Sequence, residues 1–300
     1  MKNRALIALL AVAPLALSGC AAGGAAEREP LTSGVDQAAK DALPADIRDI
    51  GVLNVAIDYP YPPFAYDDEN GNPVGLDVDL AYAIGEKLDI PVKVNKQPFD
   101  TVIASLQANT NDIIISGMND TLERQATLDF IEYLYAGFAI AVPKGNPDGV
   151  KTVTDLCGLT ISSQKASTTG DILVGLNDDC TAAGKPEIKI HELASVPDSQ
   201  TAVQAGNADA FIGDAPIMAN LVQTAGNGTL FELLEFPEMP NGFDPVYTGI
   251  GVLKADEGLS NAILLAMKSI EADGSYATLL EKNGLTQYAV KQVDLNLAER

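Results

Sequence analysis

From about residue 50 onward, short apolar runs alternate along the chain with segments whose apolar residues recur at helical spacing. Runs rich in β-branched residues predict strands, and segments with a period near 3.6 predict amphipathic helices. In the first part of the chain the predicted strands are 52–57, 92–94 and 112–116, and the predicted helices are 79–88 and 101–107. Strands that alternate with helices favour an α/β fold with a largely parallel sheet, which helices cover on both faces.

A second set of alternating elements follows from residue 150. Its predicted strands are 159–163, 188–193 and 210–213, and its predicted helices are 169–176, 199–205 and 215–224. The extended apolar runs 138–142 and 249–253 can carry the chain out of a first lobe and back, and the helix-rich segment 259–283 then returns to that lobe. We therefore predict that lobe 1 comprises residues 44–141 and 250–300 and that lobe 2 comprises residues 142–249.

The amino terminus has the pattern of an export signal. Lys2 and Arg4 precede the apolar run 5–17, and small residues come before Cys20. This pattern is typical of a secretory signal peptide, and the run is too short to span a membrane as a mature helix. The ending Leu-Ser-Gly-Cys resembles the bacterial lipobox, which implies removal of residues 1–19 and lipidation of Cys20. We expect an exported protein whose lipid anchors it to the outer face of the cell membrane.

Residues 20–43 are small and polar and show no periodic apolar positions. A segment of this kind cannot bury enough apolar surface to offset the entropy lost on ordering. The sequence therefore predicts a flexible tether between the lipid and the folded domain.

Charge and composition exclude several classes of function. The 300 residues include 41 acidic and 19 basic side chains, for a formal net charge of −22. Nucleic-acid binding is excluded, because neutralising phosphates requires clustered Lys and Arg. The single histidine, His191, cannot build a zinc site from several imidazoles, and we expect no metal and no cofactor.

Two cysteines remain after Cys20 is assigned to the lipid. Cys157 and Cys180 lie 23 positions apart. In an oxidising compartment a lone pair of thiols is more often a disulfide than a metal site. We predict a disulfide, with two unrelated buried thiols as the alternative.

Four motifs appear in a fixed order along the first lobe. They lie at 55–64 (VAIDYPYPPF), 75–79 (GLDVD), 99–100 (FD) and 112–124 (DIIISGMNDTLER). As an ordered set, from about residue 50 to 287, they resemble the extracellular solute-binding proteins of polar amino-acid ABC importers, solute-binding family 3. The resemblance implies a two-lobe periplasmic-binding-protein fold of type II with two hinge crossovers. It also implies a monomer that closes on one amino acid, is not an enzyme, and delivers its ligand to an ABC permease and its ATPase.

Arg124 is the candidate that holds the ligand's carboxylate. Its planar guanidinium can donate two parallel hydrogen bonds to a carboxylate, which a lysine cannot reproduce. It follows the predicted strand 112–116 and the potential helix cap Thr121, at a strand end where open α/β sheets bind ligands. The alternative is a surface arginine that pairs with Glu123 or Asp120.

Candidates in the second lobe provide a negative charge and hydroxyl groups. Asp214 follows the predicted strand 210–213, and the resemblance implies that it holds the ligand's α-ammonium. Ser167, Thr168 and Thr169 stand between a strand and a helix, where hydroxyls and free amides can meet a carboxylate. Ala166 stands where the family has glycine.

The remaining candidates come from the resemblance. It implies rings from Tyr61 and Phe99 over the ligand's aliphatic part, and a carboxylate at Asp58 that reaches the ligand's side chain. Such an acid favours a cationic or amide side chain, unless Asp58 caps the turn before Pro60. Asp120 stands where the family often has an apolar residue, and its direction is open. The complete set of ligand candidates is Asp58, Tyr61, Phe99, Ser116, Gly117, Met118, Asn119, Arg124, Ser167, Thr168, Thr169 and Asp214.

Two alternative functions share this fold. One is a periplasmic dehydratase of the cyclohexadienyl type, for which His191 is the obvious acid or base, although its apolar strand neighbours favour a structural histidine. The other is a ligand-sensing ectodomain that acts through a separate partner. For binding we expect cleft closure about hinges near 138–142 and 246–250.

Overall fold

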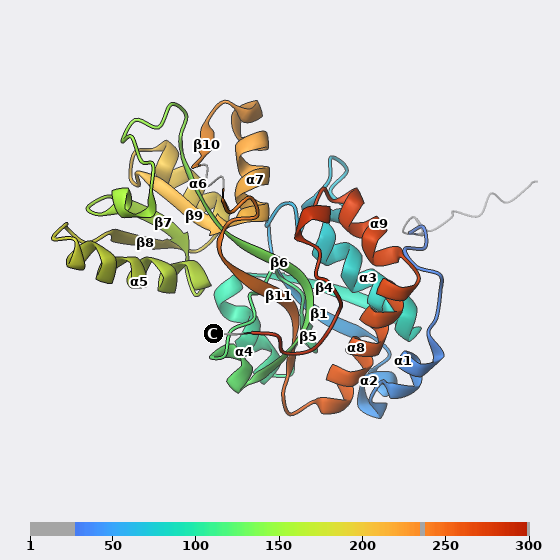
Figure 1. Ribbon diagram of the computed structural model, residues 1–300. Coiled ribbons are helices and arrows are strands. Elements are labelled where there is room, and N and C mark those ends of the chain that lie inside the picture. The colour runs from blue at the N-terminus through green and yellow to red at the C-terminus, as the bar shows by residue number, and fades with distance from the viewer. Residues whose placement is uncertain (1–27, 235–237, 299–300) are drawn as a thin grey trace, which may run out of the picture.

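The computed structural model describes residues 28–234 and 238–298. Figure 1 shows two lobes that are joined by two long strands. Within the described residues a sheet of nine strands runs through both lobes in the order β4-β1-β5-β11-β6-β9-β7-β8, with β10 paired to β6. The strands of lobe 1 are β4 (Val92–Gln97), β1 (Leu53–Asp58), β5 (Ile113–Ile114) and one half each of β11 (Phe243–Leu253) and β6 (Leu128–Pro143).

Lobe 2 is built on the other half of β6. This half pairs antiparallel with β9 (Ala210–Asp214), and β7 (Thr160–Gln164) pairs parallel with both β9 and β8 (Lys189–Leu193). The short strand β10 (Phe231–Leu233) pairs with the end of β6. Parallel strands place their carboxyl ends at one edge of the sheet, and in lobe 2 this edge faces lobe 1.

The hinge strands β6 and β11 are longer than the apolar runs that predicted them. They pair antiparallel over most of their length, from Phe243 with Phe138 to Leu253 with Leu128. They also cross closely, because a Cβ at Gly137 would collide with the backbone of Gly242 and Phe243. Glycine is required at this crossing for that reason.

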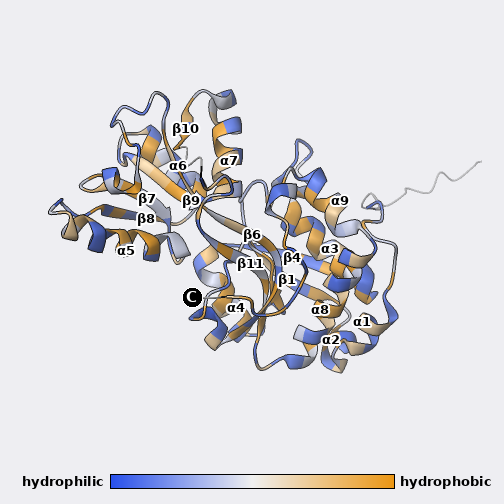
Figure 2. Ribbon diagram, in the orientation of Figure 1, coloured by the Kyte–Doolittle hydropathy of each residue, from blue (hydrophilic) through white to orange (hydrophobic). Residues whose placement is uncertain are grey.

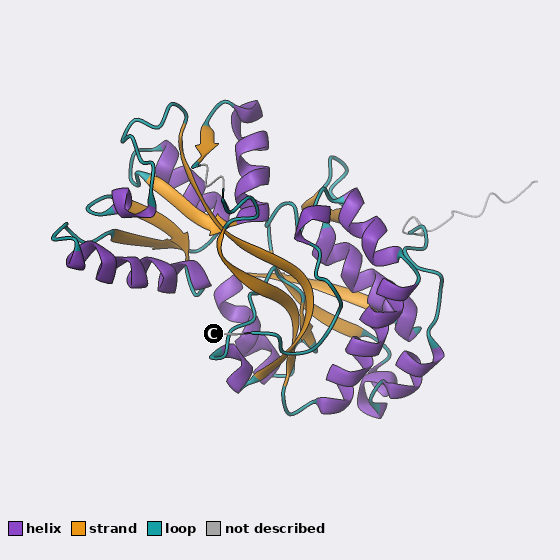
Figure 3. Ribbon diagram, in the orientation of Figure 1, coloured by secondary structure: helices purple, strands orange, loops and turns teal. Residues whose placement is uncertain are grey.

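Helices cover both faces of the sheet in each lobe (Figure 3). In lobe 1, α4 (Val102–Gln107) packs on one face, and the other carries α3 (Leu76–Leu88) and α8 (Glu257–Ala272). Next to these lie α1 (Gln37–Ala42), α2 (Ala45–Ile50) and α9 (Ser275–Lys282), and the separate two-stranded sheet is β2 (Tyr66–Asp67) with β3 (Pro73–Val74). In lobe 2, α5 (Thr168–Ala182) covers one face, and α6 (Val196–Gln204) and α7 (Ala215–Thr224) cover the other. Apolar residues are concentrated on the strands and on the inner sides of these helices (Figure 2).

The predicted tether is wrong for residues 28–43. Asp36 caps α1 by accepting a hydrogen bond from the Ala39 amide, and Ala39 and Leu43 are buried in the core of lobe 1. The amides of Leu31 and Thr32 also donate to a carboxylate of α3, at 2.9 Å each. The burial of Ala39 and Leu43, the cap at Asp36 and the hydrogen bonds to α3 therefore hold a segment whose apolar residues do not recur at helical spacing. The predicted signal peptide and the lipidation site Cys20 lie outside the described residues.

Cys157 and Cys180 form the predicted disulfide, which links the segment before β7 to α5 in lobe 2. Cys180 is buried in the apolar cluster under α5, and Cys157 packs against that cluster. Across residues 28–234 and 238–298, no helix has both the length and the apolar character of a membrane span.

Candidate functional site

The groups predicted to bind the ligand meet where the two lobes face each other. Asp58 ends β1 in lobe 1, whereas Gln164 ends β7 and Asp214 ends β9 in lobe 2. The loop 117–124 follows β5 and completes the lobe 1 side. Three strand ends and one loop thus bring polar side chains together at the position where open α/β sheets bind ligands.

Asp214 is held across the cleft by two lobe 1 side chains. The Tyr61 hydroxyl donates to Oδ2 at 3.0 Å, and the Asn119 amide donates to Oδ1 at 2.9 Å. Burial raises the pKa of Asp214, although the hydrogen bonds from Asn119 and Tyr61 act in the opposite direction. The arrangement provides a carboxylate, partly screened from water, that can accept a cationic donor.

Arg124 is half-buried, and its fork spans the two lobes. Nη1 donates to the carbonyl of Asn119 at 2.7 Å, and Nη2 donates to the carbonyl of Ala166 at 3.0 Å. Burial lowers its pKa, and the charge of Asp214 opposes this shift. Among the described residues Arg124 forms no ion pair. Both fork nitrogens thus donate to neutral carbonyls, which a ligand carboxylate can replace with stronger, charge-assisted hydrogen bonds.

Arg124 lies in a short 3₁₀ turn and not in an α-helix. The Thr121 hydroxyl accepts a hydrogen bond from the Arg124 amide at 3.2 Å, as a capping residue does. Phe99 is buried beside it, with its ring centroid 5.7 Å from the guanidinium carbon. The ring therefore shapes the lobe 1 wall next to the cation.

Asp58 is almost fully buried and also bridges the lobes. Its Oδ2 accepts a hydrogen bond from Gln164 Nε2 at 2.7 Å, and its own amide donates to the Ser116 hydroxyl at 2.8 Å. Burial raises the pKa of Asp58 to about 6, although the bond from Gln164 opposes this. The Asp58 carboxylate also caps the turn before Pro60, because Oδ1 accepts a hydrogen bond from the Tyr59 amide at 3.0 Å, while contact with a ligand's side chain stays a prediction. The carboxylate both stabilises its turn and faces the opposite lobe.

Buried groups behind the cleft hold the start of the loop 117–124. The Gly117 amide donates to Asp77 Oδ2 at 2.8 Å and to the Tyr133 hydroxyl at 3.1 Å. The Tyr133 hydroxyl in turn donates to Asp77 Oδ1 at 2.7 Å. Gly117 has a φ of 54°, and a Cβ there would lie 2.7 Å from the Tyr61 ring. Only glycine can make this turn and leave room for the ring.

The hydroxyl trio at the start of α5 divides between two surfaces. Ser167 and Thr169 lie 2.7 Å apart through their hydroxyls and line a small cavity with Tyr61 and Asp214. Thr168 instead lines a groove of about 700 Å³ beside α5, and its buried hydroxyl has no hydrogen-bond partner. Ala166 has a φ of 61°, a conformation that glycine adopts more readily, and its carbonyl is the one that Arg124 holds.

Three residues that the sequence singled out lie away from the cleft groups. Met118 is buried with Phe99 in the apolar cluster under α4. Asp120 is fully buried and faces Gln125 and Ala298, the last described residue of the chain. His191 lies on β8, at the far edge of lobe 2.

Sequence reasoning missed Gln164 and Lys165. Lys165 Nζ forms an ion pair across the cleft with Asp100 Oδ2 at 2.9 Å. Gln164 carries a signal that could have found it, because it directly follows a predicted lobe 2 strand, as Asp214 does. Lys165 carries no such signal, since an exposed lysine after a strand is ordinary.

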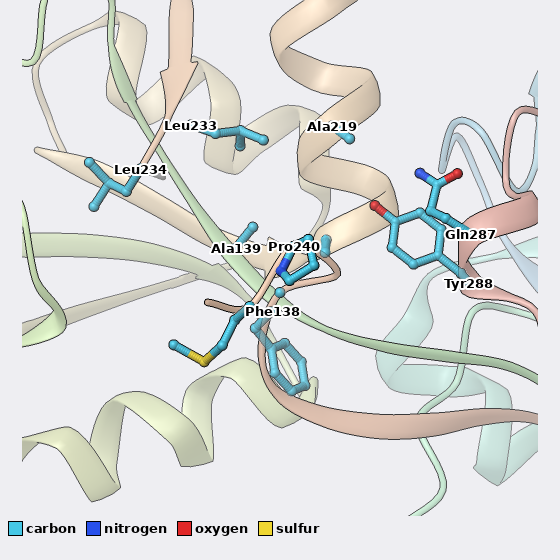
Figure 4. Close-up of a pocket in the computed structure, with 11 residues that line it drawn as sticks. Phe138, Ala139, Ala219, Leu233, Leu234, Pro240, Gln287 and Tyr288 are labelled. Atoms are coloured by element: carbon cyan, nitrogen blue, oxygen red, sulfur yellow. The ribbon is translucent and has the colours of Figure 1, made fainter. Parts of the chain in front are cut away.

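The lobes contact each other directly at the polar strand ends. The cavity that Tyr61, Gln164 and Asp214 help to enclose is about 10 Å³, roughly the space for one water molecule. A larger cavity, of about 420 Å³, lies behind the hinge, where Leu233 and Leu234 of lobe 2 face Gln287 and Tyr288 (Figure 4). Its described lining contains none of the predicted ligand residues. Within residues 28–234 and 238–298, no cluster of His, Cys, Asp and Glu is placed to hold a metal ion.

Comparison with known proteins gives consistent matches. The model of the family described as bacterial extracellular solute-binding proteins, family 3, matches residues 53–286. An arginine-binding protein of Corynebacterium glutamicum is 32% identical over 59% of this chain and 58% of its own length. A probable histidine-binding protein of Neisseria gonorrhoeae is 30% identical over 93% of this chain and 96% of its own length.

Solved structures of the same architecture confirm the predicted fold. An ancestral arginine-binding protein bound to arginine aligns with a TM-score of 0.69 and 30% identity, covering 78% of this chain and 98% of that one. An ancestral amino acid-binding protein, a precursor of cyclohexadienyl dehydratase, aligns with a TM-score of 0.67 and 29% identity, covering 79% and 97%. The two-lobe α/β fold with two hinge crossovers is therefore established.

Proposed function

The chain belongs to the bacterial extracellular solute-binding proteins of family 3, and we propose that it is the binding component of an ABC importer for a polar amino acid. The protein is a monomer that a lipid at Cys20 anchors to the membrane. It captures its ligand outside the cytoplasm and delivers this ligand to a permease and its ATPase. The observation that carries the proposal is that one cation, Arg124, and one carboxylate, Asp214, lie at the cleft from opposite lobes and are linked through Asn119, which bonds to both. These charges match the carboxylate and the ammonium of an amino acid.

Capture requires the lobes to open and close again. The cavity of about 10 Å³ is too small for an amino acid, so the contacts across the cleft must break before a ligand can enter. In the mechanism we propose, the ligand carboxylate meets the Arg124 fork on lobe 1 in place of the carbonyls of Asn119 and Ala166. Closure then brings Asp214 to the ammonium, and Ser167 and Thr169 to the carboxylate. The hinge strands β6 and β11 absorb the rotation.

We infer a preference for a cationic side chain. Asp58 places a second, deeply buried acid in the cleft, and its present partner is the Gln164 amide, a donor. A guanidinium or ammonium on the ligand can take the place of that amide and gain a charge-assisted hydrogen bond. Relatives named for arginine and histidine support the same class.

The dehydratase alternative has less support from the geometry. It calls for an acid or base beside the ligand, and His191 lies on β8, which pairs with β7 on the side away from β9 and Asp214. The alternative rests on the fold and on the kinship with an ancestral precursor of such an enzyme.

A thermal-shift panel tests the proposal. The twenty amino acids, ornithine and citrulline are added to the protein one at a time at pH 7.5. A ligand present at a hundredfold excess over its dissociation constant should stabilise the folded state by about 2.7 kcal/mol, and we expect arginine, lysine or ornithine to do so. No shift with any compound would overturn the amino-acid class.

The pH dependence of arginine affinity tests the role of Asp58. Because its pKa is raised to about 6, Asp58 gains a proton as the pH falls through that value and no longer offers a charge to a cation. The dissociation constant for L-arginine should therefore rise between pH 7.5 and pH 5.5. The Asp58→Asn variant should bind arginine weakly at both pH values, with no change in its dissociation constant between them. If its dissociation constant still rose at pH 5.5 as in the wild type, the assignment of Asp58 would be refuted.

A further inference from the structure

The last described residues, 293–298, form a strap along the outer edge of β6 (Figure 1). The Glu132 amide donates to the carbonyl of Asp294 at 3.0 Å, and the Asn296 amide donates to the carbonyl of Phe130 at 2.9 Å. The Asn296 side chain accepts a further bond from the Phe130 amide at 2.8 Å. The strap thus pairs with β6 through one antiparallel bridge, between Ile131 and Leu295, on the side opposite to β11.

Two carboxyl groups are enclosed between the strap and the loop 117–124. Asp120 and Glu132 are both fully buried. The Asp120 carboxylate accepts bonds from Gln125 Nε2 at 2.8 Å and from the Ala298 amide at 2.8 Å. The Leu297 amide reaches Glu132 Oε1 at 3.5 Å, and Glu132 Oε2 has no hydrogen-bond partner.

The surroundings provide little positive charge. The charged groups on the neighbouring elements are Asp129 on β6 and Glu123 and Arg124 on the loop, with Lys254 donating to the Gln125 carbonyl. On the strap side they are Asp294, which pairs with Lys268 at 3.6 Å, and Glu271, which accepts from the Val293 amide. No ion pair among the described residues reaches either buried carboxyl. Two adjacent buried carboxylates without a cation cannot both remain charged, because desolvation and repulsion add together.

We propose that Glu132 holds a proton that it donates to Asp120, and that this pair, closed by the strap, holds the loop 117–124 in the conformation that presents Asn119 and Arg124 to the ligand. A proton on Glu132 Oε2 turns an unpartnered buried acceptor into a donor to Asp120. The proton on Glu132 is supported by the burial of both carboxyls, by the unpartnered Oε2 and by the successive amides of Leu297 and Ala298 that reach one carboxyl each, whereas its effect on binding rests on the proposed function. Neither side chain faces the cleft, so both are positioning residues.

The connection from the pair to the site is short. The Asp120 amide donates to the carbonyl of Tyr247 at 2.8 Å, and the Gly249 amide donates to the carbonyl of Met118 at 3.0 Å. Asn119 lies between these two bonds, so β11 holds its backbone on one side. On the other side the next residue, Asp120, is held through its side chain by the strap amide of Ala298. A change in the pair therefore displaces the residue that holds both Asp214 and Arg124.

The direction of the pH effect follows from the same contacts. Burial, together with the neighbouring Asp120, raises the pKa of Glu132 from its ordinary value of 4.5 to about 10. Between these values the folded protein holds a proton that the unfolded chain has lost. Stability from this group is therefore greatest below about pH 4.5 and declines as the pH rises towards 10.

Melting curves from pH 6 to pH 10 test the proton on Glu132 directly. Glu132→Gln supplies a permanent donor, so its melting temperature should fall less per pH unit than that of the wild type. Asp58 and Asp77, whose pKa values are also raised, titrate in both proteins and cancel in the difference. Asp294→Asn removes one acid from the strap but leaves the pair intact, and it should follow the wild type. Parallel curves for the wild type and Glu132→Gln would overturn the proposal.

Affinity for L-arginine over the same range tests the positioning role. The ligand's own ammonium loses its proton here, so the ratio of wild-type to Glu132→Gln dissociation constants is the quantity to follow. This ratio should be near 1 at pH 7 and about 2 at pH 10. At pH 10 half of the wild-type molecules have lost the proton from Glu132, so the fraction of molecules able to bind is halved. A ratio that stays at 1, with melting curves that differ as expected, would refute the positioning role. If no variant binds arginine or any other amino acid, the proposed function fails, while the melting curves still decide the proton on Glu132.

Discussion

The two faces of the cleft are supported in different ways. On lobe 1 the binding groups are held from behind: Gly117 by Asp77 and Tyr133, and the loop after it by the buried pair and β11. On lobe 2 the Asp214 side chain and the Gln164 amide have their partners on the opposite lobe.

The buried hydroxyls show the same contrast. Ser163, Thr168 and Ser199, all in lobe 2, have buried oxygens without a hydrogen-bond partner, whereas the buried hydroxyl of Tyr133 in lobe 1 both donates and accepts. A fully bonded network keeps its geometry when the lobes part, and groups that bond only across the cleft do not. We propose that lobe 1, whose loop backbone is held within the lobe, is the preformed half of the site and that closure completes lobe 2.

The largest effect should come from Arg124, the cation of the preformed half. We expect Arg124→Ala to weaken amino-acid binding by about a hundredfold or more, because losing one partner of a close charge pair costs roughly 2–5 kcal/mol. The melting temperature without ligand should change little, since the side chain is only half-buried and its hydrogen bonds go to two carbonyls. Calorimetry measures the affinity.

Arg124→Lys is the matched control for this prediction. It keeps the charge but loses the planar fork, so it should recover only part of the affinity. Unchanged affinity in Arg124→Ala would contradict both the site and the view that lobe 1 binds first.

The sequence predicted the fold well because the fold depends on local patterns. Apolar strand runs and helix-spaced segments are set by burial, and the ordered motifs added the connection of the lobes. It also indicated Arg124 and Asp214, because residues at strand ends lie at the cleft. It could not indicate that Asp120 turns inward, since this depends on Ala298, which is distant in sequence. The order in residues 28–43 was missed for the same reason.

A medium effect should come from Asp77, which supports the lobe 1 turn. In the wild type the Gly117 amide and the Tyr133 hydroxyl each donate to a different oxygen of Asp77, whereas Asp77→Asn leaves a single oxygen for both donors. Losing one buried hydrogen bond costs about 1–3 kcal/mol, so the melting temperature should drop by several degrees and the affinity by about tenfold. Thermal melting and calorimetry on the same sample measure both.

The lobe 2 counterpart of this prediction is Ser199→Ala. Its buried hydroxyl has no partner, so replacing it should leave stability unchanged or raise it slightly. If Ser199→Ala destabilised the protein as much as Asp77→Asn, the contrast between the lobes would be lost.

The smallest effect should come from the rim of the cleft, where Lys165 of lobe 2 meets Asp100 of lobe 1 at 2.9 Å. The pair holds the lobes together but is largely exposed on the lysine side, so it contributes little. We expect Lys165→Met to raise the association and dissociation rates of the amino acid by no more than about fivefold each, because both steps pass through the open form. Stopped-flow measurements at low salt give the rates. The wild type should approach the variant as salt is added, because exposed ion pairs are screened. A hundredfold change, or rates that salt does not affect, would mean that the ion pair and not the preformed lobe 1 site controls closure.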